Sequence, residues 1–196
     1  MKLMRWTLKL ISFPLRWLWD QCLASSIAQV FIASIIQVIH YSQTRYISSQ
    51  LKSCGLNLRL QFPIHLLQPN LIEIGDNVSI AAYVHVWGGG GVKIGNRVMI
   101  GSHTAITSIT HDYSVGNMYQ TIVTHPIVIE DDVWIGTHAV ILPGVTIGKG
   151  AVIGAGCIVT KNVLPQAVMT GVPGRVLKFR CDCYESMNSS HLIGAE

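Results

Sequence analysis

His111 and Asp112 lie in the stretch ITSITHDYSV, residues 106–115. An imidazole accepts a proton near neutral pH, and a hydrogen bond at its other ring nitrogen orients it. Asp112 is adjacent in sequence, but adjacency does not place its carboxylate there, and a backbone carbonyl would serve as well. Taken alone, a histidine in such a stretch is more typical of a turn that fixes a loop. Its role therefore depends on the elements around it.

Aliphatic residues recur every six positions on both sides of this stretch, and the pattern stops for the 23 positions from Ile106 to Ile129. A second small or aliphatic residue stands two positions before each of them, and side chains two apart on a strand share a face. Each unit is thus a short strand with an inward pair, and the glycine that often follows relieves the steric limit of a tight corner. The phased residues are Ile74, Ile80, Val86, Ile94, Ile100, Ile106, Ile129, Ile135, Ile141, Ile147, Ile153 and Val159.

A single six-residue unit cannot bury its apolar face, whereas stacked units can, so the period predicts a β solenoid. An insertion in a solenoid leaves the coil as a loop and disturbs only its neighbours. Residues 107–126 are therefore expected to form one long extruded loop, which can reach a neighbouring subunit and wall off a site.

The segments IGNRVMIGSHTAI and HPIVIEDDVWIGTHAVILPGVTIGKGAVIGAGCIVTKNVLPQAVMTGVPGRVLK resemble the hexapeptide-repeat acetyltransferases. They are most similar to the sugar O-acetyltransferases of the galactoside, maltose and colanic-acid types. The resemblance covers about residues 71–180 and is most specific over 126–178. It implies a left-handed parallel β-helix with three strands per coil, and homotrimers with active sites between adjacent β-helices. It also implies acetyl-CoA as the acyl donor, with no metal.

The same resemblance assigns individual roles. His111 matches the catalytic histidine at the start of the family's loop, and His125 at the end of the loop is the rival base. On the donor side, Trp134 matches a tryptophan near the acceptor and the pantetheine arm, and Thr137 and Ala155 match two positions on that arm. Thr160 and Lys161 match residues near the CoA phosphates, and Arg175 and Lys178 match basic residues at the adenosine end.

The acceptor side departs from the family pattern. The galactoside and maltose enzymes use polar Asn and Asp residues, whereas AAYVHVWGGGGV stands at residues 81–92. We therefore expect an acceptor other than a simple galactoside or maltose, contacted by His85, Trp87 and Asp112. Trp87 would either stack on a sugar ring or pack at a corner. His85, His103 and His138 are expected at repeat corners, as surface or inter-subunit groups.

Charge separates the first 60 residues from the rest. Residues 1–60 hold seven basic residues and one acidic residue, a net charge of +6, whereas the remainder holds seven basic and nine acidic residues, a net charge of −2. This distribution gives no indication of a nucleic-acid-binding core. Five scattered cysteines, Cys181 and Cys183 among them, indicate reduced thiols in a cytoplasmic protein rather than a disulfide framework or a zinc site.

Residues 1–60 are predicted to be an amphipathic helical segment ahead of the β-helix domain at 61–180, with a tail at 181–196. Lys2, Arg5, Lys9 and Arg16 form one basic stripe beside a Trp/Leu/Phe face, and Pro14 is expected to kink or divide the helix. Residues 22–41 carry no charge but are amphipathic. Three interpretations stay open: a helical cap on the domain or a neighbouring subunit, peripheral contact of residues 1–41 with a membrane, and a membrane span.

The sequence as a whole predicts an acetyl-CoA-dependent O-acetyltransferase of cell-surface saccharide biosynthesis. Its acceptor would be a saccharide. If the basic N-terminus contacts a membrane, that saccharide would be lipid-linked at the inner face of the cytoplasmic membrane. The alternatives are an antibiotic or amino-sugar acceptor, a zinc enzyme like the γ-carbonic anhydrases, and a non-catalytic scaffold. His103, His111, His125 and His138 supply the residue type for zinc, but their spacing does not match that family.

Overall fold

The computed structural model describes the backbone of residues 2–180 and the side chains of residues 25–180. Residues 1–43 and 44–196 are separate compact units. Cys181, Cys183 and the tail predicted at 181–196 lie outside the described residues, and so do the side chains of the predicted basic stripe.

The N-terminal part is one helix, α1 (Lys2–Gln50), which is not divided at Pro14. Proline removes one backbone hydrogen bond, and the remainder of a 49-residue helix is retained around it. Residues Ser25–Gln50 are long and apolar enough to cross a membrane, and none of that window is buried. Large apolar side chains such as Ile27, Phe31 and Val38 are exposed along it.

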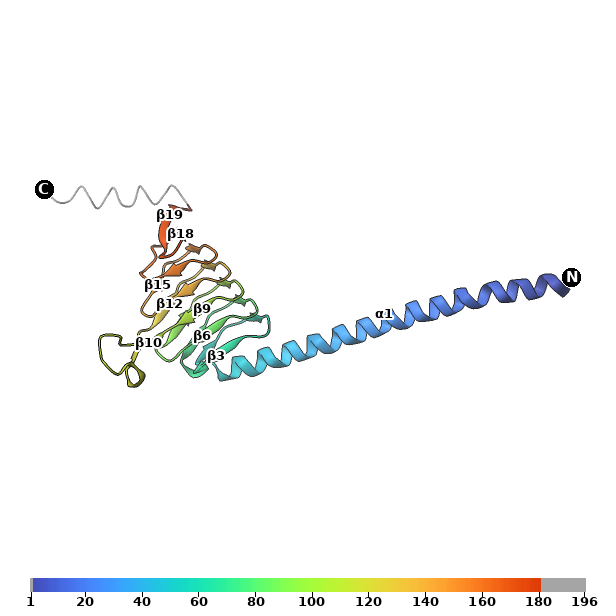
Figure 1. The fold of residues 1–196 in the computed structure, drawn as a ribbon, viewed down its shortest axis with the longest axis horizontal. Coiled ribbons are helices and arrows are strands. Elements are labelled where there is room, and N and C mark those ends of the chain that lie inside the picture. The colour runs from blue at the N-terminus through green and yellow to red at the C-terminus, as the bar shows by residue number, and fades with distance from the viewer. Residues whose placement is uncertain (1, 181–196) are drawn as a thin grey trace. The chain divides into compact units, whose positions relative to one another are not determined.

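The second unit is a parallel β-helix with three sheets, whose coils follow one another from β3 to β19 (Figure 1). Sheet A contains β1 (Ser53–Cys54), β4 (Ile72–Ile74), β7 (Val92–Ile94), β12 (Ile127–Ile129) and β15 (Thr146–Ile147). Sheet B contains β2 (Arg59–Leu60), β5 (Ser79–Ile80), β8 (Met99–Ile100), β13 (Trp134–Ile135), β16 (Val152–Ile153), β18 (Ala167–Thr170) and β19 (Arg175–Phe179), the last antiparallel to β18. Sheet C contains β3 (His65–Leu67), β6 (His85–Trp87), β9 (Ala105–Thr107), β14 (Val140–Ile141) and β17 (Ile158–Val159).

The predicted inward pairs form the core. Every phased aliphatic residue is buried, and so is each partner two positions earlier, including the polar Thr104. Ile129 pairs in register with Ile147, which is 18 residues or three repeats further on. Ile74 pairs with Ile94 at a spacing of 20, because the corner at Gly88–Gly91 is longer. The solenoid predicted from the period is confirmed.

Glycines at the corners serve close packing between coils. A Cβ at Gly136 would lie 2.6 Å from the backbone nitrogen of Ala155 in the next coil, and one at Gly101 would lie 2.6 Å from that of Thr137. The left-handed backbone conformation stands two residues further along, at non-glycine residues such as His103 and His138. Gly101 and Gly136 are therefore required by coil-to-coil distance rather than by a positive φ.

One coil precedes the repeat pattern. β1, β2 and β3 pair with β4, β5 and β6, so the β-helix includes residues ahead of the predicted start at 61. Its strand residues Cys54, Leu60 and Leu66 keep the six-residue spacing and pair in register with Ile74, Ile80 and Val86, but Leu66 and Ile74 are eight positions apart rather than six.

The predicted excursion is a hairpin that leaves the coils after sheet C (Figure 1). β10 (Ile109–His111) pairs antiparallel with β11 (Ile122–Thr124), and a short 3-10 helix, η2 (Met118–Gln120), lies between them. A second one, η1 (Pro69–Leu71), precedes β4. Tyr113 and Tyr119 are almost fully exposed on the hairpin, so its tip packs on nothing within the described chain.

Candidate active site

The base of the hairpin is fixed by the buried hydroxyl of Ser108. This Oγ donates to the carbonyl oxygen of Trp87 at 2.6 Å and accepts from the backbone N–H of Gly90 at 2.8 Å. The carbonyl of Ser108 accepts from the backbone N–H of His125 at 3.0 Å, which closes the loop. Both ends of the excursion are therefore tied to the same corner of the β-helix.

Replacing Ser108 by alanine should destabilise the protein by about 1–3 kcal/mol, because the N–H of Gly90 loses its acceptor in a partly buried position. Urea unfolding measures the loss, and faster amide exchange in residues 109–124 should accompany it. Ser79→Ala, in a strand on sheet B, is the matched control and should stay within about 0.5 kcal/mol of wild type. Equal effects of the two substitutions would contradict this role of Ser108.

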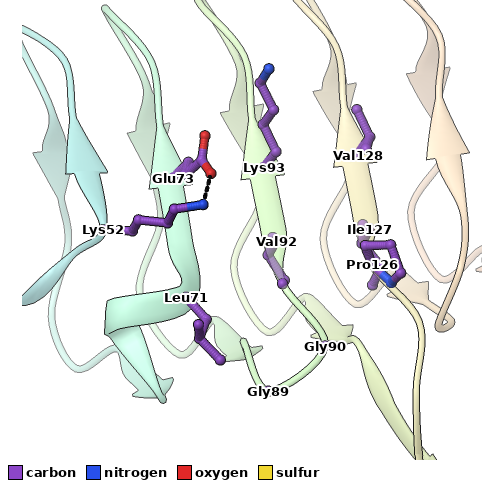
Figure 2. A pocket seen from close by; sticks show the side chains of 11 residues that line it. Lys52, Leu71, Glu73, Gly89, Gly90, Val92, Lys93, Pro126, Ile127 and Val128 are labelled. Carbon is purple, nitrogen blue, oxygen red and sulfur yellow. Dashed lines mark hydrogen bonds and ion pairs between the residues drawn. The ribbon is translucent and has the colours of Figure 1, made fainter.

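The four-glycine run packs beneath this base. A Cβ at Gly89 would meet the side chain of Ile109, and one at Gly90 would lie 2.4 Å from the carbonyl oxygen of Ser108. On the sheet A side, the same corner borders a pocket of about 380 Å³ whose rim holds Lys93 and the Lys52–Glu73 ion pair (Figure 2). None of the residues predicted for catalysis or for acetyl-CoA lines this pocket. The glycines therefore seat the hairpin, and the pocket lies apart from the residues predicted for catalysis and for acetyl-CoA.

His111 ends β10, and its imidazole is oriented by the backbone. Its Nδ1 lies 2.9 Å from the carbonyl oxygen of Met118. A carbonyl oxygen only accepts, so Nδ1 carries a hydrogen in this contact, and in the neutral imidazole the lone pair is then on Nε2. The side chain is exposed, so Nε2 is open to an incoming hydroxyl. The ring thus has the tautomer and the access that a general base needs.

Asp112 has a different partner. Its Oδ1 accepts from the hydroxyl of Ser114 at 2.6 Å and from the backbone N–H of Ser114 at 2.9 Å. These bonds, the hydroxyl bond first, hold the pKa of Asp112 below its ordinary value, so the carboxylate is charged at neutral pH. Asp112 therefore builds the turn that follows His111, and the carbonyl of Met118 orients the imidazole.

Three of the predicted donor residues lie on sheet B and on the corner between sheets B and C. Trp134 is half-exposed on β13, and Thr137 and Ala155 are exposed at the corner, in successive coils. Strand β9 of sheet C separates this corner from the one at which the His111 hairpin leaves. One chain therefore does not bring His111 together with Trp134, Thr137 and Ala155.

The remaining predicted donor and acceptor residues are also distributed between different corners and sheets of the β-helix. Thr160 and Lys161 follow β17, on the corner from which the hairpin leaves, and Arg175 and Lys178 are exposed on β19 at the end of sheet B. Trp87 is 44% exposed and pairs in register with Thr107, close to the hairpin base, whereas His85 stands edge-on to His65. Trp87 is thus the predicted acceptor residue of sheet C nearest to the excursion.

The histidines proposed as alternative zinc ligands are also split. His103 and His138 stack on each other at the corner between sheets B and C, whereas His111 and His125 lie on the hairpin and at its end. Among residues 25–180, no three His, Cys, Asp or Glu side chains gather as a metal site would require.

Two features of the site were not predicted from the sequence. The orienting group for His111 is a backbone carbonyl, which every residue carries, so no sequence signal marks Met118. Ser108 did leave a signal, since it is a small polar residue at the point where the pattern of buried residues breaks.

Comparison with known proteins agrees with this architecture. The family model described as bacterial transferase hexapeptide (six repeats) matches residues 126–161. The chain is 36% identical over 137 residues to the galactoside O-acetyltransferase of Escherichia coli K12, which covers 67% of this chain and 66% of that protein. The chain thus spans just under two thirds of this curated relative, and 42% of a Schizosaccharomyces pombe relative.

Solved structures extend the match. A hexapeptide-repeat acetyltransferase from Vibrio cholerae superposes with a TM-score of 0.70 at 32% identity, over 73% of this chain and 82% of that one. A galactoside acetyltransferase in complex with coenzyme A superposes with a TM-score of 0.67 at 33% identity, over 71% and 70% of the two chains. With its stacked repeats, its three sheets and this coverage, the chain belongs to the hexapeptide-repeat acetyltransferase family and has that family's left-handed β-helix.

Proposed function

We propose that the protein transfers an acetyl group from acetyl-CoA to a hydroxyl of a saccharide, with His111 as the general base. The observation that carries the proposal is the contact of His111 Nδ1 with the carbonyl of Met118, which in a neutral imidazole places the hydrogen on Nδ1 and the lone pair on the exposed Nε2. Family relatives that act on galactosides and maltose support the acceptor class. A Vibrio cholerae neighbour solved with acetyl-CoA supports the donor.

The transfer needs no covalent enzyme intermediate. Nε2 of His111 takes the proton of the acceptor hydroxyl as its oxygen bonds to the thioester carbonyl carbon. When the resulting tetrahedral intermediate collapses, the carbon–sulfur bond breaks, the ester is formed and the sulfur leaves with the bonding pair. The imidazolium of His111 then returns its proton to the sulfur. Trp134 and the exposed corner at Thr137 and Ala155 would bind the donor arm, and Lys161, Arg175 and Lys178 its phosphates.

We further infer that the working protein is a homotrimer. Because His111 and the donor corner lie on different corners of one chain, a second copy is needed to place Thr137 and Ala155 opposite Nε2. Closed cyclic assembly supplies that arrangement once per interface.

Mixing two inactive variants tests this division. His111→Ala removes the base, and Ala155→Trp fills the donor corner. Homotrimers of either should be inactive, whereas co-expression at equal levels should restore about a quarter of wild-type turnover, since one interface in four joins two intact halves. Acetyl-CoA turnover by the purified mixture is the measurement. A mixture as inactive as its components would place the whole site within one chain.

The acceptor is tested by acetyl-CoA turnover over a library of nucleotide-, lipid- and polymer-linked sugars, with His111→Ala as the blank. Matched hydroxyl and amine acceptors belong in the same library, because an amino-sugar or antibiotic acceptor would use the same base. Turnover confined to amines would replace O-acetylation by N-acetylation. If the protein did not bind acetyl-CoA in calorimetry, the result would favour a non-catalytic scaffold over an acetyltransferase.

For localisation, we propose that the protein is cytoplasmic and contacts the inner face of the membrane through residues 1–41. The unburied apolar window of α1 and the four basic residues before residue 17 support this contact. Such a helix would keep the enzyme near a lipid-linked acceptor.

Deleting residues 2–41 should therefore release the protein from membrane fractions and lower its turnover on lipid-linked acceptors several-fold, with turnover on free saccharides unchanged. High-salt and carbonate washes of the membrane fraction separate charge-dependent contact from insertion. Unchanged membrane recovery of the truncated protein would contradict the proposed contact.

A further inference from the structure

The divided site places two corners of each chain against neighbouring copies. The His111 hairpin leaves from the corner between sheets C and A, and Thr137 and Ala155 lie on the corner between sheets B and C. In a closed ring of three copies, each chain meets one neighbour at the first corner and the other neighbour at the second. These corners are the two ends of sheet C. Either sheet C or the opposite corner, between sheets A and B, therefore faces the axis of such a ring.

Charge distinguishes these two arrangements. Sheet C is the one sheet of the described β-helix whose strands hold no Lys, Arg, Asp or Glu residue. Glu73 and Lys93 lie on the outer face of sheet A, and the corner between sheets A and B carries an ion pair in which Nε of Arg97 lies 2.6 Å from Oδ1 of Asp132. Burying charged groups at the centre of an interface is costly, and interface centres are depleted of them. Sheet C is therefore the face that fits the axis.

The outer face of sheet C is also largely apolar. Leu67 and Trp87 pair in register and remain 42% and 44% exposed. Beside them, Ala105, Val140 and Ile158 pair in register from coil to coil and are each half-buried. A continuous apolar surface of this kind, without charge, is typical of a face that another protein covers.

The uncharged surface continues around the corner between sheets B and C. There the ring of His103 stacks on Tyr83 at 4.7 Å and on His138 at 4.6 Å, in a ring column that joins three coils. No Lys, Arg, Asp or Glu residue stands between a strand of sheet B and the next strand of sheet C in any described coil. Sheet C and the corner that a neighbouring copy must reach thus form one surface.

We propose that sheet C faces a three-fold axis and packs against the sheets C of two further copies of the chain. His85 and Trp87 are then assembly residues, and they do not contact the acceptor as expected from the sequence. The inference rests on the proposed homotrimer and deepens it, since it names the face through which the chains associate. The same packing turns the hairpin of one chain toward Thr137 and Ala155 of the next.

A matched pair of substitutions tests the face. Val128 and Val140 belong to the same coil and are both half-buried, but Val128 lies on sheet A and Val140 on sheet C. Val140→Lys would place three ammonium groups around the axis. It should weaken trimer association at least about a hundredfold, whereas Val128→Lys should change it less than about threefold. Sedimentation equilibrium of the full-length protein gives the association constants, and circular dichroism checks that each variant keeps its β structure.

Trp87→Ala separates assembly from acceptor binding. It should weaken trimer association about tenfold or more, because a large apolar side chain leaves the interface. At protein concentrations where the trimer is complete, the KM for the saccharide with the highest turnover should stay within about twofold of wild type.

A Val140→Lys protein that associates as strongly as Val128→Lys would overturn the inference. So would a Trp87→Ala protein with wild-type association and a KM raised several-fold, which would return Trp87 to the acceptor. If wild type itself is monomeric at all concentrations, the proposed homotrimer fails instead.

Discussion

His111→Ala should lower acetyl-CoA-dependent turnover about a hundred- to ten-thousand-fold, the usual loss when a general base is removed. The affinity for acetyl-CoA should change little, because the histidine leaves from a different corner than the one proposed to hold the donor arm. Steady-state kinetics with a saccharide acceptor and calorimetry with coenzyme A separate the two effects.

His125→Ala is the matched control, because this exposed histidine closes the other end of the same excursion. We expect it to retain most of the wild-type turnover, since the contact of its main chain with Ser108 survives the substitution. A fully active His111→Ala protein would overturn the assignment of His111 as the base. A loss of turnover of about a hundredfold or more in His125→Ala would overturn it as well.

Gly136→Ala should destabilise the β-helix by about 3 kcal/mol, at the upper end of the range for overpacking. The new methyl group would lie 2.6 Å from the nitrogen of Ala155 and 2.9 Å from the carbonyl oxygen of Ile153. Both are backbone atoms of the next coil and cannot rotate away. The donor corner would move with them, so coenzyme A binding should weaken together with stability.

Gly116→Ala provides the comparison, because its Cβ would have no atom within 4 Å and its φ is not positive. We expect its free energy of unfolding to stay within about 0.5 kcal/mol of wild type. Chemical denaturation of both variants measures the difference, and a Gly136→Ala protein as stable as Gly116→Ala would show that adjacent coils can separate at this corner.

The fold was predictable because the period of six is repeated along the chain, and each repeat places its aliphatic pair in the same continuous core. The first coil escaped prediction because the step from Leu66 to Ile74 is eight positions, so Cys54, Leu60 and Leu66 keep a spacing of six among themselves but are out of phase with the later repeats. The excursion was placed correctly, but its antiparallel pairing was not foreseen, because β10 and β11 have no alternation strong enough to separate a hairpin from an irregular loop.

The candidate site was predictable in its parts and not in its geometry. Resemblance assigned His111, but the partner of a ring nitrogen is a three-dimensional fact, and here it is a main-chain atom. The bond between Asp112 and Ser114, by contrast, follows a local rule, since aspartate commonly bonds a backbone N–H two residues on. The ring column joins residues 20 and 35 positions apart, so it emerges only when the coils are in register.

The bond between His111 and Met118 leaves the hairpin open to change. Because the oxygen of a peptide bond holds the imidazole, the side chain at position 118 takes no part in that bond. Tyr113 and Tyr119, which point into solvent, are equally uninvolved. Selection can therefore exchange these side chains to suit a new acceptor while the base keeps its tautomer, so the loop can diversify in specificity without a simultaneous cost in chemistry.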